Sequence, residues 1–135
     1  MTFVLDASVL LKWFMEEPGS EAALGLKRRY LEGELAIVIP DLAVYEVSNV
    51  LRFKRGIPEV EVKATMQAFW RLDLEIVAPT ESLLDDAIHF SFTTGLSLYD
   101  CVYLALAREL DAVLITADAR LHRAASKLIR TTVLR

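Results

Sequence analysis

The sequence predicts an α/β protein in which helices cover both faces of a mainly parallel sheet. Five short runs rich in Val, Ile and Leu have the apolar character of strands buried on both sides. They are FVL from Phe3, LAIVI from Leu35, LEIVA from Leu74, AVLIT from Ala112 and TTVL from Thr131. Longer stretches with helical spacing separate these runs. Because parallel neighbours need such crossovers, this alternation predicts the architecture.

Residues that favour helix ends punctuate the stretches between the runs. In chain order, helix starts are expected at Ser20, Pro40, Pro58, Thr80 and Ser97, and helix ends at Gly33 and Gly95. Asp41 follows Pro40 and is expected to cap that helix.

Length and composition fit one domain spanning residues 1–135, since 54% of the residues are hydrophobic and 25% are charged. A net charge of -4 argues against a protein that coats nucleic acid through bulk charge, but it allows a local basic track. Cys101 is the only cysteine, which excludes an intramolecular disulfide and a cysteine-based zinc site. Neither a basic leader nor a long uncharged apolar run is visible. We therefore expect a cytoplasmic protein with no membrane partner.

Two aspartates lie where strands of such a sheet end. Asp6 directly follows the first predicted strand, and Asp118 lies just beyond the fourth, in LITADAR. In open parallel sheets, ligands bind in the crevice beyond the carboxyl ends of the strands, so both side chains are expected at that edge. Each aspartate is equally suited to cap the helix that follows it, and position alone does not separate the two roles.

Glu46 lies within DLAVYEVSNVL, a predicted helix. Its neighbours about one turn away are Leu42, Ala43, Val50 and Asn49, the only asparagine in the chain. A glutamate in such surroundings needs a partner, unless this face of the helix is mixed and exposed.

Asp100 lies near the start of LSLYDCVYLALAREL, a predicted helix that is apolar on almost every side. It suits a capping box with Ser97, and it also complements the helix dipole. However, a helix that follows a parallel strand begins at the carboxyl edge of the sheet, so Asp100 can face the crevice that Asp6 and Asp118 face. With Glu46, four carboxylates are predicted to converge there.

A cleft that holds four carboxylates needs positive charge, because like charges repel and buried acids are costly. Mg²⁺ or Mn²⁺ would supply it, since these cations prefer oxygen ligands and are commonly held by carboxylates together with substrate phosphate. No His or Cys cluster points to zinc, and His89 and His122 are assigned no ligand role. Such a site predicts metal-assisted hydrolysis of a phosphodiester.

The motifs around these acids resemble those of a known family. VLDASVLLKWFMEE, PDLAVYEVSNVL, LSLYDCVYLALA and LITADARL are similar, in order and spacing, to the four acidic motifs of PIN-domain ribonucleases, particularly VapC-like toxins of prokaryotic toxin–antitoxin modules. The resemblance spans nearly the entire chain. It implies a metal-binding and catalytic role for four acids, Asp6, Glu46, Asp100 and Asp118. It implies a supporting role for three polar residues, Ser8, Asn49 and Thr116.

The resemblance also implies a fold and a biological role. It implies a three-layer α/β/α sandwich whose five-stranded parallel sheet has the order 3-2-1-4-5, so that the first and fourth strands are neighbours. It further implies endonucleolytic cleavage of RNA with Mg²⁺ or Mn²⁺, homodimerisation, and inhibition by a small antitoxin protein that docks near the site. The expected protein is therefore a single PIN-like nuclease domain, the toxin of a VapBC-type pair.

Other functions stay open at the level of sequence. A haloacid dehalogenase-type hydrolase would use Asp6 as nucleophile, but it usually has a second Asp where this chain has Ser8. A phosphoacceptor receiver domain needs its acceptor after the third strand, where this chain has Pro79. A PIN nuclease that processes RNA without being a toxin, and a non-catalytic RNA-binding or assembly module, are further alternatives.

Substrate contacts are less visible in the sequence. Four basic residues could hold phosphates at the mouth of the cleft, but we favour a role in helix ends and surface solubility for Lys12, Arg52, Lys54 and Arg55. Trp13 and Phe14 are expected in the core or a dimer interface rather than stacked on bases, and Cys101 is expected to serve packing.

Overall fold

The computed structural model describes all 135 residues, and its centre is one five-stranded sheet. The strands are β1 (Thr2–Leu5), β2 (Ala36–Pro40), β3 (Glu75–Val77), β4 (Val113–Thr116) and β5 (Thr131–Val133). Their order is β3-β2-β1-β4-β5, and every neighbouring pair is parallel. The predicted sheet and its order are confirmed, and every strand overlaps the apolar run that predicted it.

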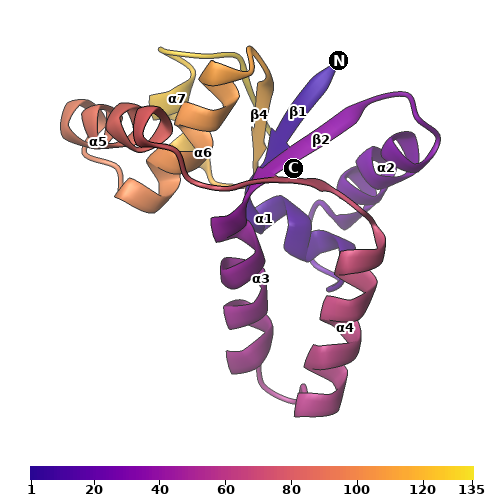
Figure 1. The fold of residues 1–135 in the computed structure, drawn as a ribbon. Coiled ribbons are helices and arrows are strands. Elements are labelled where there is room, and N and C mark those ends of the chain that lie inside the picture. The colour runs from indigo at the N-terminus through magenta and orange to yellow at the C-terminus, as the bar shows by residue number, and fades with distance from the viewer.

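Seven α-helices and one 3-10 helix connect the strands. They are α1 (Ala7–Leu10), η1 (Leu11–Trp13), α2 (Ser20–Leu31), α3 (Asp41–Phe53), α4 (Glu59–Arg71), α5 (Glu81–Thr94), α6 (Leu98–Glu109) and α7 (Ala119–Ala125). Figure 1 shows α5, α6 and α7 together on one side of the sheet, whereas α1 and α2 lie on the other. The predicted α/β/α layering is thereby confirmed.

Capping side chains begin two helices where the sequence predicts them. Thr80 Oγ1 accepts a hydrogen bond from the Leu83 N–H at 3.1 Å, and Ser97 Oγ accepts one from the Asp100 N–H at 3.1 Å. Gly95 ends α5 with φ +77°, a left-handed conformation that costs glycine little. The chain can therefore turn directly from α5 into α6.

Two predicted caps are wrong by one residue. Ser20 is the first residue of α2 rather than its cap, because Gly19 takes the cap position with φ +89°. The Ser20 hydroxyl instead accepts from the Glu17 N–H and donates to the Met15 carbonyl. Asp41 is likewise the first residue of α3, because the extended Pro40 occupies the cap position. The Asp41 carboxylate can complement the helix dipole at this position, but it does not cap the helix.

The core lies where α6 packs between the sheet and α5. Tyr103 is 2% exposed, and the four residues that follow it, 104–107, are fully buried together with Cys101. Trp13 is also buried, and its Nε1 donates to the Ala23 carbonyl at 2.8 Å. The packing roles expected of Trp13 and Cys101 are confirmed. Because α6 starts at the carboxyl edge of the sheet, its buried turns fix the position of Asp100.

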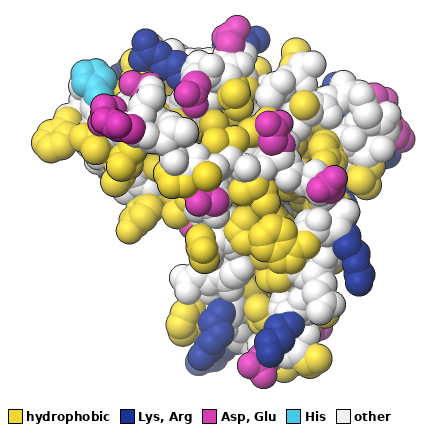
Figure 2. All heavy atoms as spheres, viewed as in Figure 1, with side chains coloured by type: hydrophobic (Ala, Val, Ile, Leu, Met, Phe, Trp, Pro, Cys, Tyr) yellow, Lys and Arg dark blue, Asp and Glu magenta, His cyan; other side chains and the backbone are white.

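Helices α3 and α4 form an arm that extends away from the sheet (Figure 1). Figure 2 shows hydrophobic side chains between the two helices and Lys and Arg side chains at the far end of the arm. The chain contains no single helix that is long and apolar enough to cross a membrane. Glu46 lies in the second turn of α3, which places it near the sheet rather than at the far end.

Candidate active site

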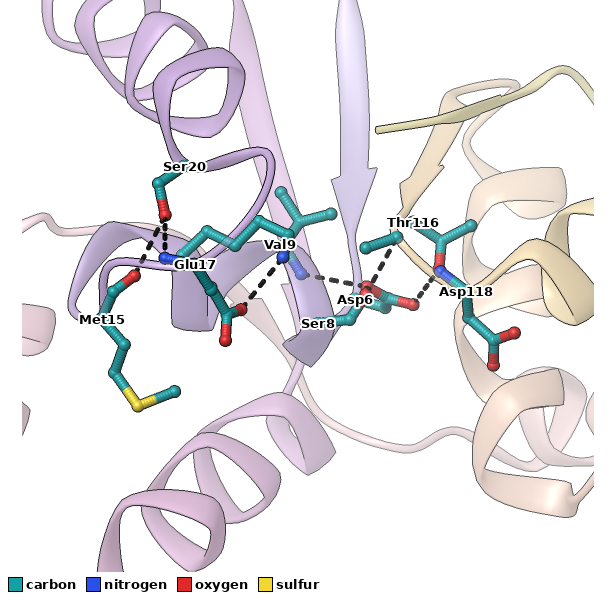
Figure 3. Close-up of polar contacts among 10 residues, drawn as sticks. Asp6, Ser8, Val9, Met15, Glu17, Ser20, Thr116 and Asp118 are labelled. Atoms are coloured by element: carbon teal, nitrogen blue, oxygen red, sulfur yellow. Dashed lines mark hydrogen bonds and ion pairs between the residues drawn. The ribbon is translucent and has the colours of Figure 1, made fainter. Parts of the chain in front are cut away.

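Asp6 follows the last residue of β1 and is held by three hydrogen bonds. Ser8 Oγ donates to Asp6 Oδ1 at 2.5 Å, and the Val9 N–H donates to the same oxygen at 3.3 Å. Thr116 Oγ1, from the end of β4, donates to Asp6 Oδ2 at 2.5 Å. Figure 3 shows the Asp6 carboxylate between the two hydroxyl side chains. Both of its oxygens are therefore fixed in direction by the protein.

The Asp6 carboxyl is costly to ionise where it lies. Only 6% of the residue is exposed, and burial raises its pKa from 3.8 to about 6. The hydrogen bonds from Ser8, Thr116 and Val9 favour the charged form, while the charge of Asp100 opposes it. An ionised Asp6 would therefore be stabilised by any cation that approaches it.

The two hydroxyls that hold Asp6 also link it to the β4–α7 turn. Ser8 Oγ accepts from the Ala117 N–H at 3.0 Å, and Thr116 Oγ1 accepts from the Asp118 N–H at 3.0 Å. This network depends on β1 and β4 being neighbours, which pairs Leu5 with Ile115. The structure thus places the Ser8 and Thr116 hydroxyls against the Asp6 carboxylate. It also places the turn that carries Asp118 beside Asp6.

The Asp118 side chain caps α7, as one of the two sequence interpretations proposed. Its Oδ1 accepts from the N–H groups of Arg120 at 2.9 Å and Leu121 at 3.3 Å. The second carboxylate oxygen makes no hydrogen bond to the protein. The capping role therefore leaves part of the carboxylate free for a ligand.

Glu46 has a partner that sequence reasoning missed. Tyr103 Oη, from the second turn of α6, donates to Glu46 Oε1 at 2.5 Å. Burial raises the pKa of Glu46, the Tyr103 hydrogen bond lowers it, and the charge of Asp100 raises it. The sequence signal for Tyr103 is its spacing, because a residue three after Asp100 lies on the same side of a helix.

Asp100 interacts electrostatically with the other acids. It is partly buried in the first turn of α6, and burial followed by the charge of Asp118 raises its pKa. Ser97 and Arg120 act in the opposite direction. The Asp100 charge in turn raises the pKa of Asp6 and of Glu46. Asp100 is therefore the acid whose charge acts on both Asp6 and Glu46.

The acids do not form a ready-made metal cage. No group of three or more His, Cys, Asp or Glu side chains lies close enough together to hold a metal ion as the side chains are arranged. The chemistry of the donors, carboxylate oxygens whose ionisation is opposed by burial and by one another, does fit a hard divalent cation. Metal binding by these residues stays a prediction.

A groove of about 530 Å³ runs along α3 beside Glu46. Its walls combine aromatic, amide and basic side chains, and they consist of Leu42, Tyr45, Glu46, Ser48, Asn49, Arg52 and Tyr99. Tyr45 is 73% exposed and Tyr99 is 62% exposed, so both rings are available to a ligand. The structure thus places Asn49 in a groove shared with Glu46, and it adds two tyrosines that sequence reasoning did not select.

Lys12 is not available at the cleft. It is 8% exposed, and its Nζ pairs with Glu17 Oε1 at 3.0 Å. The surface role expected for Lys12 is therefore wrong, because its side chain is buried, and binding a phosphate would require Lys12 to leave its ion pair with the partly exposed Glu17. Arg52, Lys54 and Arg55 are exposed, and of these Arg52 lines the groove beside Glu46.

Comparison with known proteins places this arrangement in a family. The PIN domain matches residues 3–127, which include all four acids and both strand ends that carry Asp6 and Asp118. The chain is a PIN-domain protein. The order of the sheet is thus that of a PIN-like fold.

Individual relatives of this PIN-domain chain are ribonucleases or toxins by name. It is 30% identical over 125 residues to Ribonuclease VapC3 from Pyrobaculum aerophilum, covering 90% of this chain and 92% of the relative. VapBC2 from Rickettsia felis, bound to a promoter DNA fragment, has a TM-score of 0.77 at 12% identity and full coverage of both chains. VapC20 from Mycobacterium tuberculosis, a toxin that cleaves the sarcin–ricin loop, has a TM-score of 0.66 at 13% identity, covering 83% of this chain and 86% of the other.

Proposed function

We propose that the protein is a divalent-metal-dependent endoribonuclease, one nuclease domain over residues 1–135, and the toxin of a VapBC-type pair. What carries the proposal is the position of Asp6, Glu46, Asp100 and Asp118, which come from four separate segments and lie at the carboxyl edge of a PIN-domain sheet. The 30% identity to Ribonuclease VapC3 supports ribonuclease activity.

In this proposal the four acids hold Mg²⁺ or Mn²⁺, and Ser8, Thr116 and Asn49 support them. The bound ion would supply Lewis acidity, lowering the pKa of a water and offsetting charge on the phosphate. Ser8 and Thr116 hold the Asp6 carboxylate in one orientation, because each hydroxyl donates to a different oxygen. Asn49 lies with Glu46 in the groove along α3, where it can contact the substrate.

Tyr103 keeps Glu46 in place without competing for metal. Its phenol is buried and its pKa is raised by burial and by the hydrogen bond to Glu46, so it stays neutral and donates. The second Glu46 oxygen makes no hydrogen bond to the protein. Tyr103 is therefore a positioning residue, and the free oxygen of Glu46 can bind a ligand.

Removal of the metal and of single carboxylates tests the catalytic proposal. We expect EDTA to abolish cleavage of RNA, and Asp6→Asn or Asp100→Asn to lower kcat at least about a thousandfold while the fold is retained, since each removes a charge that holds the ion. Asp86→Asn, an exposed acid on α5, is the matched control and should cleave at the parental rate. Parental rates in both Asp6→Asn and Asp100→Asn would overturn the mechanism.

The toxin role adds a partner, an oligomeric state and a compartment. One structural neighbour, from Klebsiella pneumoniae, is a toxin–antitoxin complex by title, and another is VapBC2 bound to a DNA fragment from its promoter. We propose by analogy that this chain forms a homodimer in the cytoplasm and is inhibited by a small antitoxin. Expression alone should arrest growth, co-expression of a small protein encoded immediately upstream should relieve it, and light scattering should give twice the mass of the chain. Growth unaffected by an active nuclease would favour a role in RNA processing.

A further inference from the structure

The last helix and the segment that follows it carry a net positive charge, whereas the rest of the chain is acidic. Residues 119–135 contain no Asp or Glu, whereas the whole chain has a net charge of -4. The Lys and Arg residues of this segment are Arg120, Arg123, Lys127, Arg130 and Arg135. A locally basic surface therefore adjoins an acidic protein body.

Three of these residues gather in one place. Arg120, Arg123 and Lys127 line a hollow of about 470 Å³ together with Thr94, Leu96, His122, Ala124 and Ser126. All three basic side chains are exposed and none forms an ion pair, whereas Arg130 pairs with Asp111 at 3.3 Å. We call Arg120, Arg123 and Lys127 the α7 basic patch. None of its three charges is held in an ion pair.

Helix stability does not account for the whole patch. Arg123 lies in the last turn of α7, where a cation complements the helix dipole. Arg120 lies in the first turn, where the dipole disfavours a positive charge. A cation in that position requires another reason.

The patch begins at the acids. Arg120 comes two residues after Asp118, and its backbone N–H donates to Asp118 Oδ1 at 2.9 Å. Arg123 and Lys127 then follow along α7 and the turn after it. A chain of phosphates with one phosphate at the acids can therefore continue along the patch.

We propose that the α7 basic patch binds the phosphate backbone of the RNA substrate on one side of the cleavage position. The proposal rests on the proposed function. The lining fits phosphate, because Arg, Lys and hydroxyl side chains are the groups that contact nucleic-acid backbones. Only two of the eight lining residues, Leu96 and Ala124, are hydrophobic, so the hollow offers little to the apolar side chains of a protein partner.

Salt dependence of RNA binding tests the patch. In an Asp6→Asn background, which prevents cleavage, the affinity for a fluorescein-labelled single-stranded RNA of mixed sequence is measured over a range of KCl concentrations. Removing three phosphate contacts should make the slope of log K against log [KCl] shallower by about two, since each contact on single strands contributes about 0.7. We therefore expect this reduction in Arg120→Gln/Arg123→Gln/Lys127→Gln.

Two further variants accompany the measurement, a control triple variant outside the patch and a double variant within it. Arg28→Gln/Lys63→Gln/Arg71→Gln removes the same charge from exposed positions on α2 and α4, and it should keep the parental slope. Arg123→Gln/Lys127→Gln leaves the first turn of α7 intact and should show about two-thirds of the slope reduction expected for the triple variant, so that a folding defect at Arg120 cannot decide the outcome.

The outcomes separate this proposal from the catalytic one. An unchanged slope in both patch variants, in a protein that cleaves RNA, overturns the patch and leaves the proposed function in place. A protein that binds RNA through the patch but shows no metal-dependent cleavage supports the patch and overturns the proposed function. Displacement of the labelled RNA by poly-L-glutamate at matched charge would assign the patch to an acidic protein segment instead, and it would overturn the proposal.

Discussion

Asp6 is a residue that the fold tolerates at a cost. Its raised pKa means that the folded protein binds a proton at Asp6 more tightly than the unfolded chain does. Stability from this group is thus fully present below about pH 4 and is lost as the pH rises through about 6. A shift of about two pKa units corresponds to roughly 3 kcal/mol, an order-of-magnitude value. Such a cost is typical of a group that is retained for function.

We therefore expect the metal-free protein to unfold at lower temperature as the pH rises from about 4 to about 7, through the pKa of Asp6. Asp6→Asn should remove much of this dependence and raise the Tm at neutral pH, because a neutral amide carries no ionisation cost. Thermal unfolding in EDTA over this pH range is the measurement, with Asp86→Asn as control. If Asp6→Asn follows the parental curve, burial of Asp6 does not govern the pH dependence.

Tyr103 permits a test of positioning. Its hydrogen bond lowers the pKa of Glu46, so Tyr103→Phe should move the acidic limb of the pH profile of kcat to higher pH and lower kcat by about tenfold, as loss of a hydrogen bond to a charged group predicts. Tyr30→Phe is the control, because the Tyr30 hydroxyl bonds only the Leu72 and Asp73 carbonyls away from the acids. A lower kcat with an unmoved profile would indicate a purely structural role.

At the residue scale, sequence reasoning selected charged residues better than their partners. An acid at the end of a buried strand stands out, so Asp6 and Asp118 could be found from the sequence. The contact of Tyr103 with Glu46 joins residues 57 positions apart and depends on how α6 packs against α3. The prediction of helix caps was also wrong at two single residues. Pro40, which is extended, and Gly19, which is left-handed, occupy the cap positions expected for Asp41 and Ser20.

At the scale of elements, helix α3 carries both the acid Glu46 and the groove beside it. Tyr45 precedes Glu46, Asn49 and Arg52 lie one and two turns beyond it, and Tyr99 comes from the start of α6. Exposed aromatic rings near a phosphodiester site suit unpaired bases, because base stacking on aromatic rings is worth about 1–3 kcal/mol per base.

We expect Tyr45→Ala and Tyr99→Ala each to raise KM for single-stranded RNA by about tenfold with little change in kcat, as loss of one stacked base predicts. Phe92→Ala, which truncates an 89% exposed ring on α5, should leave KM unchanged. The measurement is the KM of the three variants in steady-state cleavage of one RNA. Unchanged KM in both tyrosine variants would exclude the groove as a base-binding site.

Elements were predictable to the extent that local pattern determines them. Apolar runs located all five strands, since strands buried on both faces are continuous in sequence. The arm was harder to predict from the sequence, because the sequence pattern indicates the helices α3 and α4 but not their direction relative to the sheet. The groove depends on that direction, and its tyrosines were therefore missed.

At the scale of the whole molecule, the fold brings together charges that would separate if the chain unfolded. Residues 6, 46, 100 and 118 lie at one edge of the sheet because the order β3-β2-β1-β4-β5 makes β1 and β4 neighbours and starts α3 and α6 at the same edge. The charge of Asp100 raises the pKa of Asp6 and of Glu46, and the charge of Asp118 raises the pKa of Asp100, so these charges oppose folding when the acids are ionised.

A cation that binds the gathered acids should reverse this cost and stabilise the native state. The unfolded chain does not hold the acids together, so binding to the native state alone raises the free energy of unfolding by about 2.7 kcal/mol at a hundred times Kd. We expect Mn²⁺ or Mg²⁺ to raise the Tm of the parental protein and of Asp86→Asn by several degrees at neutral pH, but not that of Asp6→Asn. Calorimetric unfolding with and without the cation is the measurement. An equal shift in Asp6→Asn would place the stabilising ion elsewhere, and no shift in the parental protein would separate the acids from metal binding altogether.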